Sequence, residues 1–232
     1  WIDTAPLLEM PKWEDSSEAY PLSWDEQTRF FNLLPGYLQV MAVFKVNTGL
    51  REQSVCWLRW DWEVKIPELN TSIFLIPGRK AEFDDGVWPG EKNKEDQVVV
   101  LNQVARSIID KQRGKHSEYV FSYDGHRVKK IHTTSWKTAW RNAGLPIDGS
   151  FKRGPHNLKH TFGRRLRAVG VPLETRKVLL HHTNGDITSH YSGAELEELI
   201  DAVELIAGEN SRKTPTLTLI HKKSSRPLKL TA

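Results

Sequence analysis

Apolar residues recur at the three- and four-residue spacing of helices over most of the chain. Ser23, with Glu26 three positions later, forms a capping box that predicts a helix ending near Leu34, just before Pro35 and Gly36. The same spacing, bounded by capping and breaking residues, predicts further helices over 37–47, 51–60, 102–113, 133–143, 157–169, 173–180 and 195–206. The chain is therefore predicted to be mainly helical.

Two short runs are instead rich in strand-forming residues. They are 72–76 and 97–101, and the polar stretch 77–96 between them contains several glycines and prolines. We interpret this as a strand, a long excursion and a second strand, with 118–121 as a further short extended piece. The predicted fold class is α+β, mainly α-helical with one small antiparallel β-sheet, and we find no internal repeat.

The composition is that of a globular chain, because 27% of its 232 residues are charged and 38% are hydrophobic. The best apolar run, 37–44, is far shorter than the roughly 18 residues that a membrane-spanning helix needs, and no signal peptide is visible. Cys56 is the single cysteine, which excludes an internal disulfide and disfavours a thiolate metal site. The reducing cytoplasm is therefore the expected location.

The positive charge is concentrated in two blocks, although the formal net charge is only +4. Residues 151–170 contain six lysines and arginines and no acidic residue, and residues 210–232 have the same count. Such blocks indicate a polyanionic partner. Taken alone, they are equally compatible with a solvated face and a loose tail.

Arg51 and Lys92 are the first two candidates for chemistry. Gly49 permits a tight turn after one helix, and Arg51 opens the next, where an arginine among N-terminal amides can help to cradle a phosphate. Lys92 lies in a hairpin next to a strand. Each residue on its own is better explained as a solvated surface side chain.

Two further segments carry histidine, lysine and tyrosine. His156 and Lys159 are three positions apart, so the first turn of a helix presents both on one face, where both can donate to phosphate oxygens. His181 and His182 follow an apolar run, and Tyr191 lies nine residues beyond His182. A zinc site is disfavoured, since the spacing is not that of a helical histidine pair and no acidic or cysteine ligand joins them. A lone tyrosine most often serves in packing.

Together these segments closely resemble the tyrosine recombinase (phage integrase) family. The family order is an arginine, a lysine, a His-x-x-Arg box, a Gly-His pair and a tyrosine, and the chain reads Arg51, Lys92, His156-x-x-Lys159, His181-His182 and Tyr191. The resemblance covers 22–206 and implies the family's catalytic-domain fold. It further implies that 1–21 is a linker from an upstream core-binding domain and that 207–232 is a basic C-terminal tail. The start at Trp1 suggests a piece of a longer chain.

The resemblance also implies a reaction. A site-specific recombinase or integrase cuts and rejoins double-stranded DNA, for integration of a phage or mobile element, with further protomers assembled on that DNA. It needs no metal, cofactor, membrane or small-molecule substrate. Tyr191 would attack the scissile phosphate, leaving a 3′-phosphotyrosyl link and a 5′-hydroxyl.

The remaining roles are also carried over from the family. Arg51 and Lys159 would neutralise the phosphate oxygens, His182 would donate a further hydrogen bond, and His156 would assist proton transfer. Lys92 would protonate the leaving oxygen, with Lys80 as its rival. Basic residues around the box would contact the DNA, namely Lys152, Arg153, Arg164 and Arg165.

Three positions depart from the family pattern. Lys159 stands where the box usually has arginine, His181 replaces a glycine, and Ser54 stands where an acidic residue normally follows the first arginine. Lysine keeps the charge but loses the two-pronged geometry of a guanidinium. Two other readings therefore stay open: a DNA-binding relative without turnover, and an enzyme like the type IB topoisomerases. The apolar stripe of 195–206 would pack on its own domain or on a neighbouring protomer.

Overall fold

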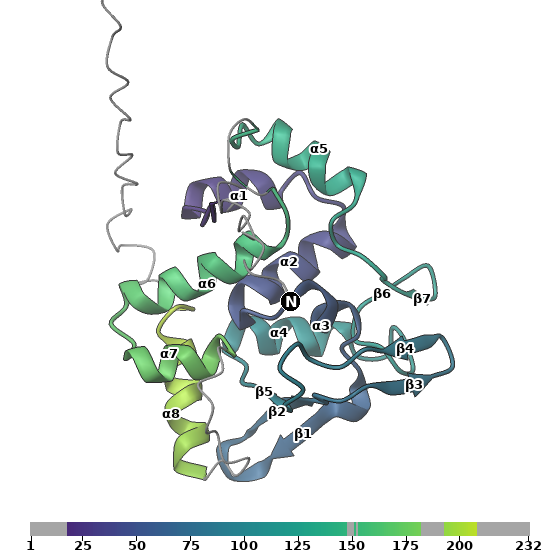
Figure 1. The fold of residues 1–232 in the computed structure, drawn as a ribbon, viewed down its shortest axis with the longest axis vertical. Helices are drawn as coiled ribbons and strands as arrows, with labels where there is room; N and C mark the ends of the chain where they lie inside the picture. Colours follow the sequence, from purple (N-terminus) through teal and green to yellow (C-terminus); the bar gives the residue numbers. More distant parts are fainter. Residues whose placement is uncertain (1–17, 148–150, 152, 182–192, 208–232) are drawn as a thin grey trace, which may run out of the picture.

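The structure is a computed structural model that describes residues 18–147, 151, 153–181 and 193–207 (Figure 1). It confirms the predicted helices with one exception. They are α1 (Trp24–Phe31), α2 (Gly36–Thr48), α4 (Gln103–Gln112), α5 (Thr134–Asn142), α6 (His156–Ala168), α7 (Leu173–Leu179) and α8 (Gly193–Glu204). The capping box is present, because Ser23 Oγ accepts from Glu26 N at 3.2 Å while Ser23 N donates to the Glu26 carboxylate at 2.8 Å.

The prediction of a single helix over 51–60 is wrong. Helix α3 (Glu52–Cys56) is short, and a 3-10 turn, η2 (Trp60–Trp62), follows it. The backbone between them is extended and pairs with 118–121, since Val120 N donates to Leu58 O and Trp60 N donates to Glu118 O, both at 2.9 Å. Pairing between distant segments thus overrides the local helical pattern.

The predicted antiparallel sheet is present and gains a strand. Its order is β1–β2–β5, built from β1 (Glu63–Ile66), β2 (Thr71–Ile76) and β5 (Gln97–Val99). A 3-10 turn, η3 (Pro67–Leu69), joins the first two strands. Two small hairpins lie beside this sheet: β3 (Ala81–Phe83) with β4 (Gly86–Trp88), and β6 (Ser122–Tyr123) with β7 (His126–Arg127). The excursion between the predicted strands therefore contains a hairpin of its own.

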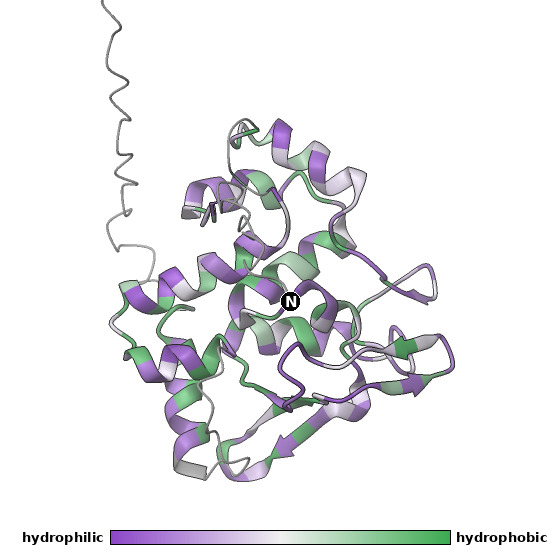
Figure 2. Cartoon of the chain, in the orientation of Figure 1, coloured by the Kyte–Doolittle hydropathy of each residue, from purple (hydrophilic) through white to green (hydrophobic). Residues whose placement is uncertain are grey.

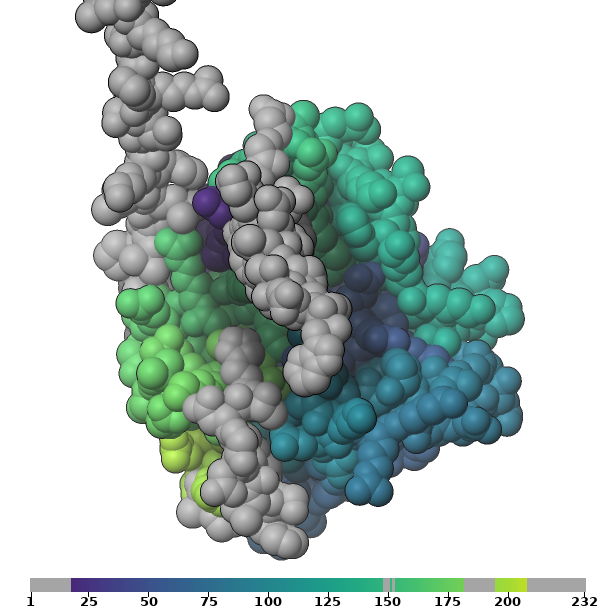
Figure 3. Space-filling view, in the orientation of Figure 1, coloured from purple at the N-terminus to yellow at the C-terminus, as the bar shows by residue number. Residues whose placement is uncertain are grey.

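The core has two apolar clusters that meet at α6. The larger one joins α1 to α5 with the sheet and includes Leu158 of α6. The smaller one packs Phe162 and Leu166, from the next turns of α6, against α7 and α8. Figure 2 shows the mixed hydrophilic and hydrophobic positions along each helix that such one-sided packing requires. In Figures 1 and 3, α6 to α8 lie at the left of the molecule and the β3–β4 and β6–β7 hairpins at the right, with the three-stranded sheet at the bottom beside α8.

The apolar stripe of α8 packs on its own domain. Leu196, Leu199, Val203 and Ile206 are buried within the smaller cluster. Polar contacts hold the helix as well, because Thr175 Oγ1 donates to Glu198 at 2.8 Å and Asn102 Nδ2 donates to Val203 O at 3.3 Å. Within the described ranges, none of these helices combines the length and apolar character that a membrane crossing requires.

Candidate functional site

The turn between α2 and α3 places Arg51 against α6. Gly49 ends α2 with φ of 67°, a left-handed conformation that favours glycine, and Arg51 is the N-cap of α3. A Cβ atom at position 49 would come within 2.4 Å of the Phe162 ring. Glycine is thus needed twice here, and the missing side chain lets the turn that carries Arg51 approach α6 closely.

The first turn of α6 carries both residues of the predicted box. His156 is exposed at the helix start, and its ring meets the edge of His160 with the ring centres 4.6 Å apart. Lys159 is buried, and its Nζ donates to the Leu180 carbonyl at the end of α7 at 2.6 Å. The box therefore faces the α2–α3 turn on one side and the end of α7 on the other.

Glu91 is a site residue that the sequence interpretation missed. Its buried carboxylate accepts from Arg51 NH1 at 2.7 Å and, through the other oxygen, from Ser54 Oγ. Local patterning could not pair residues 40 positions apart. The available signal was indirect: Ser54 stands three positions after Arg51, where the pattern that the sequence resembles has an acidic residue, so a carboxylate from another segment was a possible substitute.

Lys45 is the second such residue. It is completely buried in α2, and its Nζ donates to the Leu50 carbonyl, one residue before Arg51. Burial, followed by the positive charges of Lys159 and Arg51, lowers the pKa of Lys45 to about 7, while Glu52 and Cys56 act in the opposite direction. The signal in the sequence is that Lys45 is the single charged residue of the apolar run 37–47.

The pKa values of Lys159 and His156 are lowered in the same way, first by burial and then by neighbouring positive charges. Burial and Arg51 lower the pKa of Lys159 to about 8, although Glu91 raises it. Desolvation by the surrounding protein, then His160, Lys45, Lys159 and Arg51, lower the pKa of His156 to about 4. His156 is therefore neutral at pH 7. A multivalent anion would relieve this mutual repulsion, so the cluster is suited to bind one.

We predict that Lys45 makes the stability of the protein depend on pH. The unfolded chain keeps the lysine proton up to pH about 10.5, whereas the folded protein releases it above about 7. The free energy of unfolding should therefore rise with pH in this window, by at most about 1.4 kcal/mol per pH unit. Urea denaturation at pH 7 and 9 should show a stability difference between wild type and Lys45→Met that grows by about 2 kcal/mol in favour of wild type. A constant difference would mean that folded Lys45 stays protonated.

The other predicted site residues are exposed, lie apart from this cluster or fall outside the described residues. Lys92 and its rival Lys80 are both exposed, and Lys80 Nζ lies 4.0 Å from the Glu82 carboxylate. Arg153 is exposed, Arg164 is half-buried, and the Arg165 guanidinium lies over the Trp24 ring at 3.4 Å. Three predicted residues lie outside the described residues: Lys152, His182 and Tyr191.

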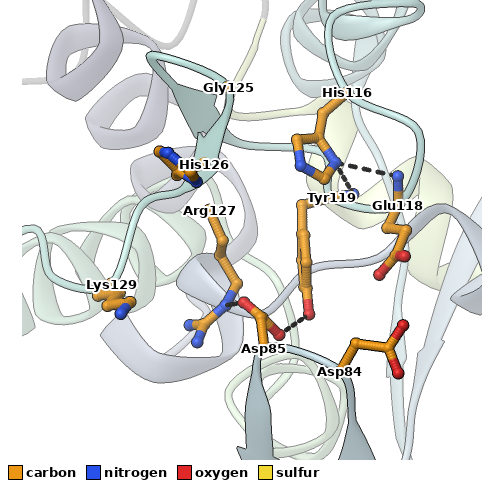
Figure 4. Close-up of a pocket in the computed structure, with 9 residues that line it drawn as sticks. All are labelled: Asp84, Asp85, His116, Glu118, Tyr119, Gly125, His126, Arg127 and Lys129. Atoms are coloured by element: carbon orange, nitrogen blue, oxygen red, sulfur yellow. Dashed lines mark hydrogen bonds and ion pairs between the residues drawn. The ribbon is translucent and has the colours of Figure 1, made fainter.

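A cavity of about 570 Å³ lies elsewhere, between the β3–β4 hairpin, the β6–β7 hairpin and residues 116–119 (Figure 4). Asp85 is the central acceptor on its wall, because it accepts from Tyr119 Oη and from Arg127 Nε, the latter at 2.7 Å. The Arg127 guanidinium also stacks on Trp57 at 3.6 Å. None of the candidate site residues lines this cavity, and the Asp85–Arg127 ion pair joins the β3–β4 turn to β7.

Comparison with known sequences gives the same family throughout. The sequence model of the phage integrase family matches residues 25–198. The integrase of Salmonella phage P22 is 26% identical over 185 residues, which cover 74% of this chain and 43% of that protein. Tyrosine recombinase XerA of Pyrococcus horikoshii is 25% identical over 177 residues, covering 72% of this chain and 58% of that protein. The chain spans about half the length of these relatives.

Solved structures with the same fold include the Tn1549 transposon integrase in complex with circular intermediate DNA. It superposes with a TM-score of 0.55 at 15% identity, over 80% of this chain and 68% of that one. A lambda integrase dimer bound to a core site gives a TM-score of 0.54 at 15% identity, over 74% of this chain and 62% of that one. At this identity, the likeness establishes the fold alone.

Proposed function

The chain belongs to the phage integrase family, and from this we propose that it cuts and rejoins double-stranded DNA through a covalent link to Tyr191. The observation that carries the proposal is the cationic cluster at the junction of α2, α3 and α6. Arg51 lies at the turn between α2 and α3, whereas His156 and Lys159 lie in the first turn of α6, more than 100 positions later, yet Arg51 lowers the pKa of both. A scissile phosphate is the ligand that this cluster fits.

The reaction follows from the chemistry of these groups. The Tyr191 phenolic oxygen forms a bond to phosphorus as the bond to the 5′-oxygen breaks, and the phosphodiester energy is kept in the phosphotyrosyl link. Rejoining reverses the step when a 5′-hydroxyl attacks that link. Arg51 and Lys159 neutralise the developing charge on the phosphate oxygens. His156, which is neutral at pH 7, assists the proton transfer from the tyrosine, and His182 donates a further hydrogen bond.

The biological setting we propose is integration of a phage or mobile element in the cytoplasm, with several protomers assembled on DNA. The named relatives support this, since they include a phage integrase and a transposon integrase in complex with DNA. Lys152, Arg153, Arg164 and Arg165 would contact the DNA backbone beside the box. Affinity that rests on such phosphate contacts falls steeply with salt.

The deciding experiment is covalent trapping. A duplex library with a randomised core and a nick near the centre loses a short fragment on cleavage, so religation is blocked and the protein stays on the DNA. An SDS-resistant adduct, recovered and sequenced, would supply the target. A gel shift without any adduct would instead favour a DNA-binding relative that has lost turnover. Relaxation of a plasmid without a target site would favour topoisomerase-like activity.

We predict that Lys92 is the general acid for the leaving 5′-oxygen. A 5′-alkoxide leaves poorly without a proton, so Lys92→Ala should slow cleavage of ordinary DNA by roughly 100-fold or more. A 5′-bridging phosphorothiolate releases a thiolate, which needs little protonation, and the variant should cleave it at nearly the wild-type rate. The measurement is the rate of adduct formation on both substrates.

Lys80→Ala is the matched control, because Lys80 is exposed in the same excursion and already lies near Glu82. It should behave like wild type on both substrates. The opposite pattern would transfer the role to Lys80. A Lys92→Ala defect that sulfur does not rescue would make Lys92 a binding residue.

A further inference from the structure

We infer that Glu91 is a positioning residue, which holds the Arg51 guanidinium in place and fixes the turn that carries Lys92. The inference rests on the proposed function, because it concerns the same site. Glu91 does not touch the reacting phosphate in this scheme. It acts through its two neighbours, one in space and one in the chain.

The Glu91 side chain is buried and is held by two hydrogen-bond partners. Its side chain is 2% exposed, and each carboxylate oxygen has a partner, Arg51 NH1 on one side and Ser54 Oγ on the other. A buried carboxylate is strongly held by such partners, since losing one leaves an uncompensated charge. Arg51 is 29% exposed and a guanidinium has five N–H donors, so pairing NH1 leaves donors for a phosphate.

Backbone contacts within the excursion 77–96 fix the position of Glu91. Glu91 N donates to Gly78 O at 3.0 Å, and Gly78 N donates to Asp96 Oδ1 at 2.8 Å. A Cβ at Gly90 would lie 2.3 Å from Gly78 O, and one at Gly78 would lie 2.2 Å from the Glu95 backbone. The two arms of the excursion therefore approach as closely as backbone allows. That close approach fixes Glu91.

Glu91 also fixes the start of the turn that holds Lys92. Lys94 N donates to Glu91 O at 2.9 Å, which closes a turn around Lys92. Lys92 itself is exposed, so its side chain is not held by packing. Glu91 thus links the residue that neutralises the phosphate to the residue that protonates the leaving group.

Ser54 explains why the carboxylate comes from the excursion. This is the position on α3 where the family pattern has an acidic residue, and here its hydroxyl donates to Glu91 instead. The charge beside Arg51 is therefore present but is supplied from another segment. A carboxylate moved back to position 54 should then replace Glu91 in part.

The test uses variants of the full chain. Their substrate is the target duplex that covalent trapping with the wild type identifies. Glu91→Gln keeps the shape and loses the charge, and Glu91→Ala loses both. We expect adduct formation to fall roughly tenfold and 100-fold respectively, the scale of a misplaced catalytic group. Glu95→Gln is the matched control, since Glu95 is an exposed carboxylate of the same excursion, and it should cleave like wild type.

Rescue separates positioning from folding. Ser54→Asp added to Glu91→Ala should recover at least tenfold of the lost rate, whereas Ser54→Asp alone should slow the wild type by placing two carboxylates together. If the double variant regains cleavage, the defect of Glu91→Ala comes from the missing carboxylate and not from general unfolding. If Glu91→Gln cleaves as fast as wild type, or faster, Glu91 is a spectator or a competitor of the phosphate, and the inference is wrong.

The pH profile gives a second readout. Lys159 faces Arg51 at the start of α3, Lys45 of α2, His156 of its own helix and Glu91, and Glu91 raises the pKa of Lys159. Without that carboxylate, Lys159 loses its proton at lower pH, so the alkaline fall of kcat/KM should begin earlier in Glu91→Gln. An unshifted fall would contradict the inference. If the wild type itself forms no adduct, the proposed function fails instead.

Discussion

Replacing Tyr191 by phenylalanine will leave DNA binding intact and abolish the SDS-resistant protein–DNA adduct. The substitution removes only the phenolic oxygen that forms the bond to phosphorus, so contacts to the DNA backbone are retained. Gel shift and adduct formation should be measured on the same nicked duplex. The loss should be complete within detection, because no other atom of that side chain can attack.

The other tyrosines provide the controls. Among the described residues, Tyr20 Oη donates to Glu26 at 2.6 Å, and burial with that carboxylate raises its pKa to about 12. Tyr119 Oη donates to Asp85, and Tyr123 stacks on Tyr37 with the ring centres 4.3 Å apart. Tyr123→Phe should therefore form adduct normally. If Tyr191→Phe still forms adduct at the wild-type level, Tyr119 and Tyr123 become the nucleophiles to test.

Removing the Lys159 ammonium will slow cleavage about 30- to 1000-fold, which corresponds to about 2–4 kcal/mol of lost transition-state stabilisation. Lys159→Met is the better variant, since it keeps the buried stem and removes the charge. Lys159→Arg should be less impaired than either Lys159→Met or Lys159→Ala because it keeps a cation at the box. Single-turnover adduct formation at saturating protein measures the effect.

Folding must be separated from chemistry here, because Lys159 also donates to the Leu180 carbonyl. Urea denaturation of each variant measures the structural share of the loss. Lys65→Ala, an exposed lysine of β1, is the control for a general loss of positive charge. Normal cleavage by Lys159→Ala would show that the box does not act on the phosphate.

Local signals were enough to predict most of the helices. Ser23, Asn102 and Thr133 each cap the following helix through the side chain, as their position before an apolar periodic run indicates. The strand β1 and the early end of α3 were not predictable in this way. Both depend on partners elsewhere: β2 for the strand, and 118–121 for the extended segment after α3.

The same distinction between local signals and distant partners applies to the candidate site. Arg51 and the box on α6 became candidates because the family resemblance gives their order, and in the structure Arg51 lies near enough to lower the pKa of both His156 and Lys159. Glu91 and Lys45 have no such motif. Their importance comes from burial and from partners brought close by the turn after α2 and by the two glycines of the excursion, which a one-dimensional pattern does not contain.

The contact between Gly49 and Phe162 limits how this chain can change over evolutionary time. A larger residue at 49 requires a smaller one at 162. If Phe162 is replaced by alanine first, the cavity that results lowers the free energy of unfolding by about 3–5 kcal/mol. Even after that change, a non-glycine residue at 49 keeps the left-handed backbone, at about 1–2 kcal/mol. The two substitutions compensate only in part, and either order passes through a destabilised intermediate. Descendants of this sequence should therefore acquire new DNA targets through substitutions elsewhere, with this pair left unchanged.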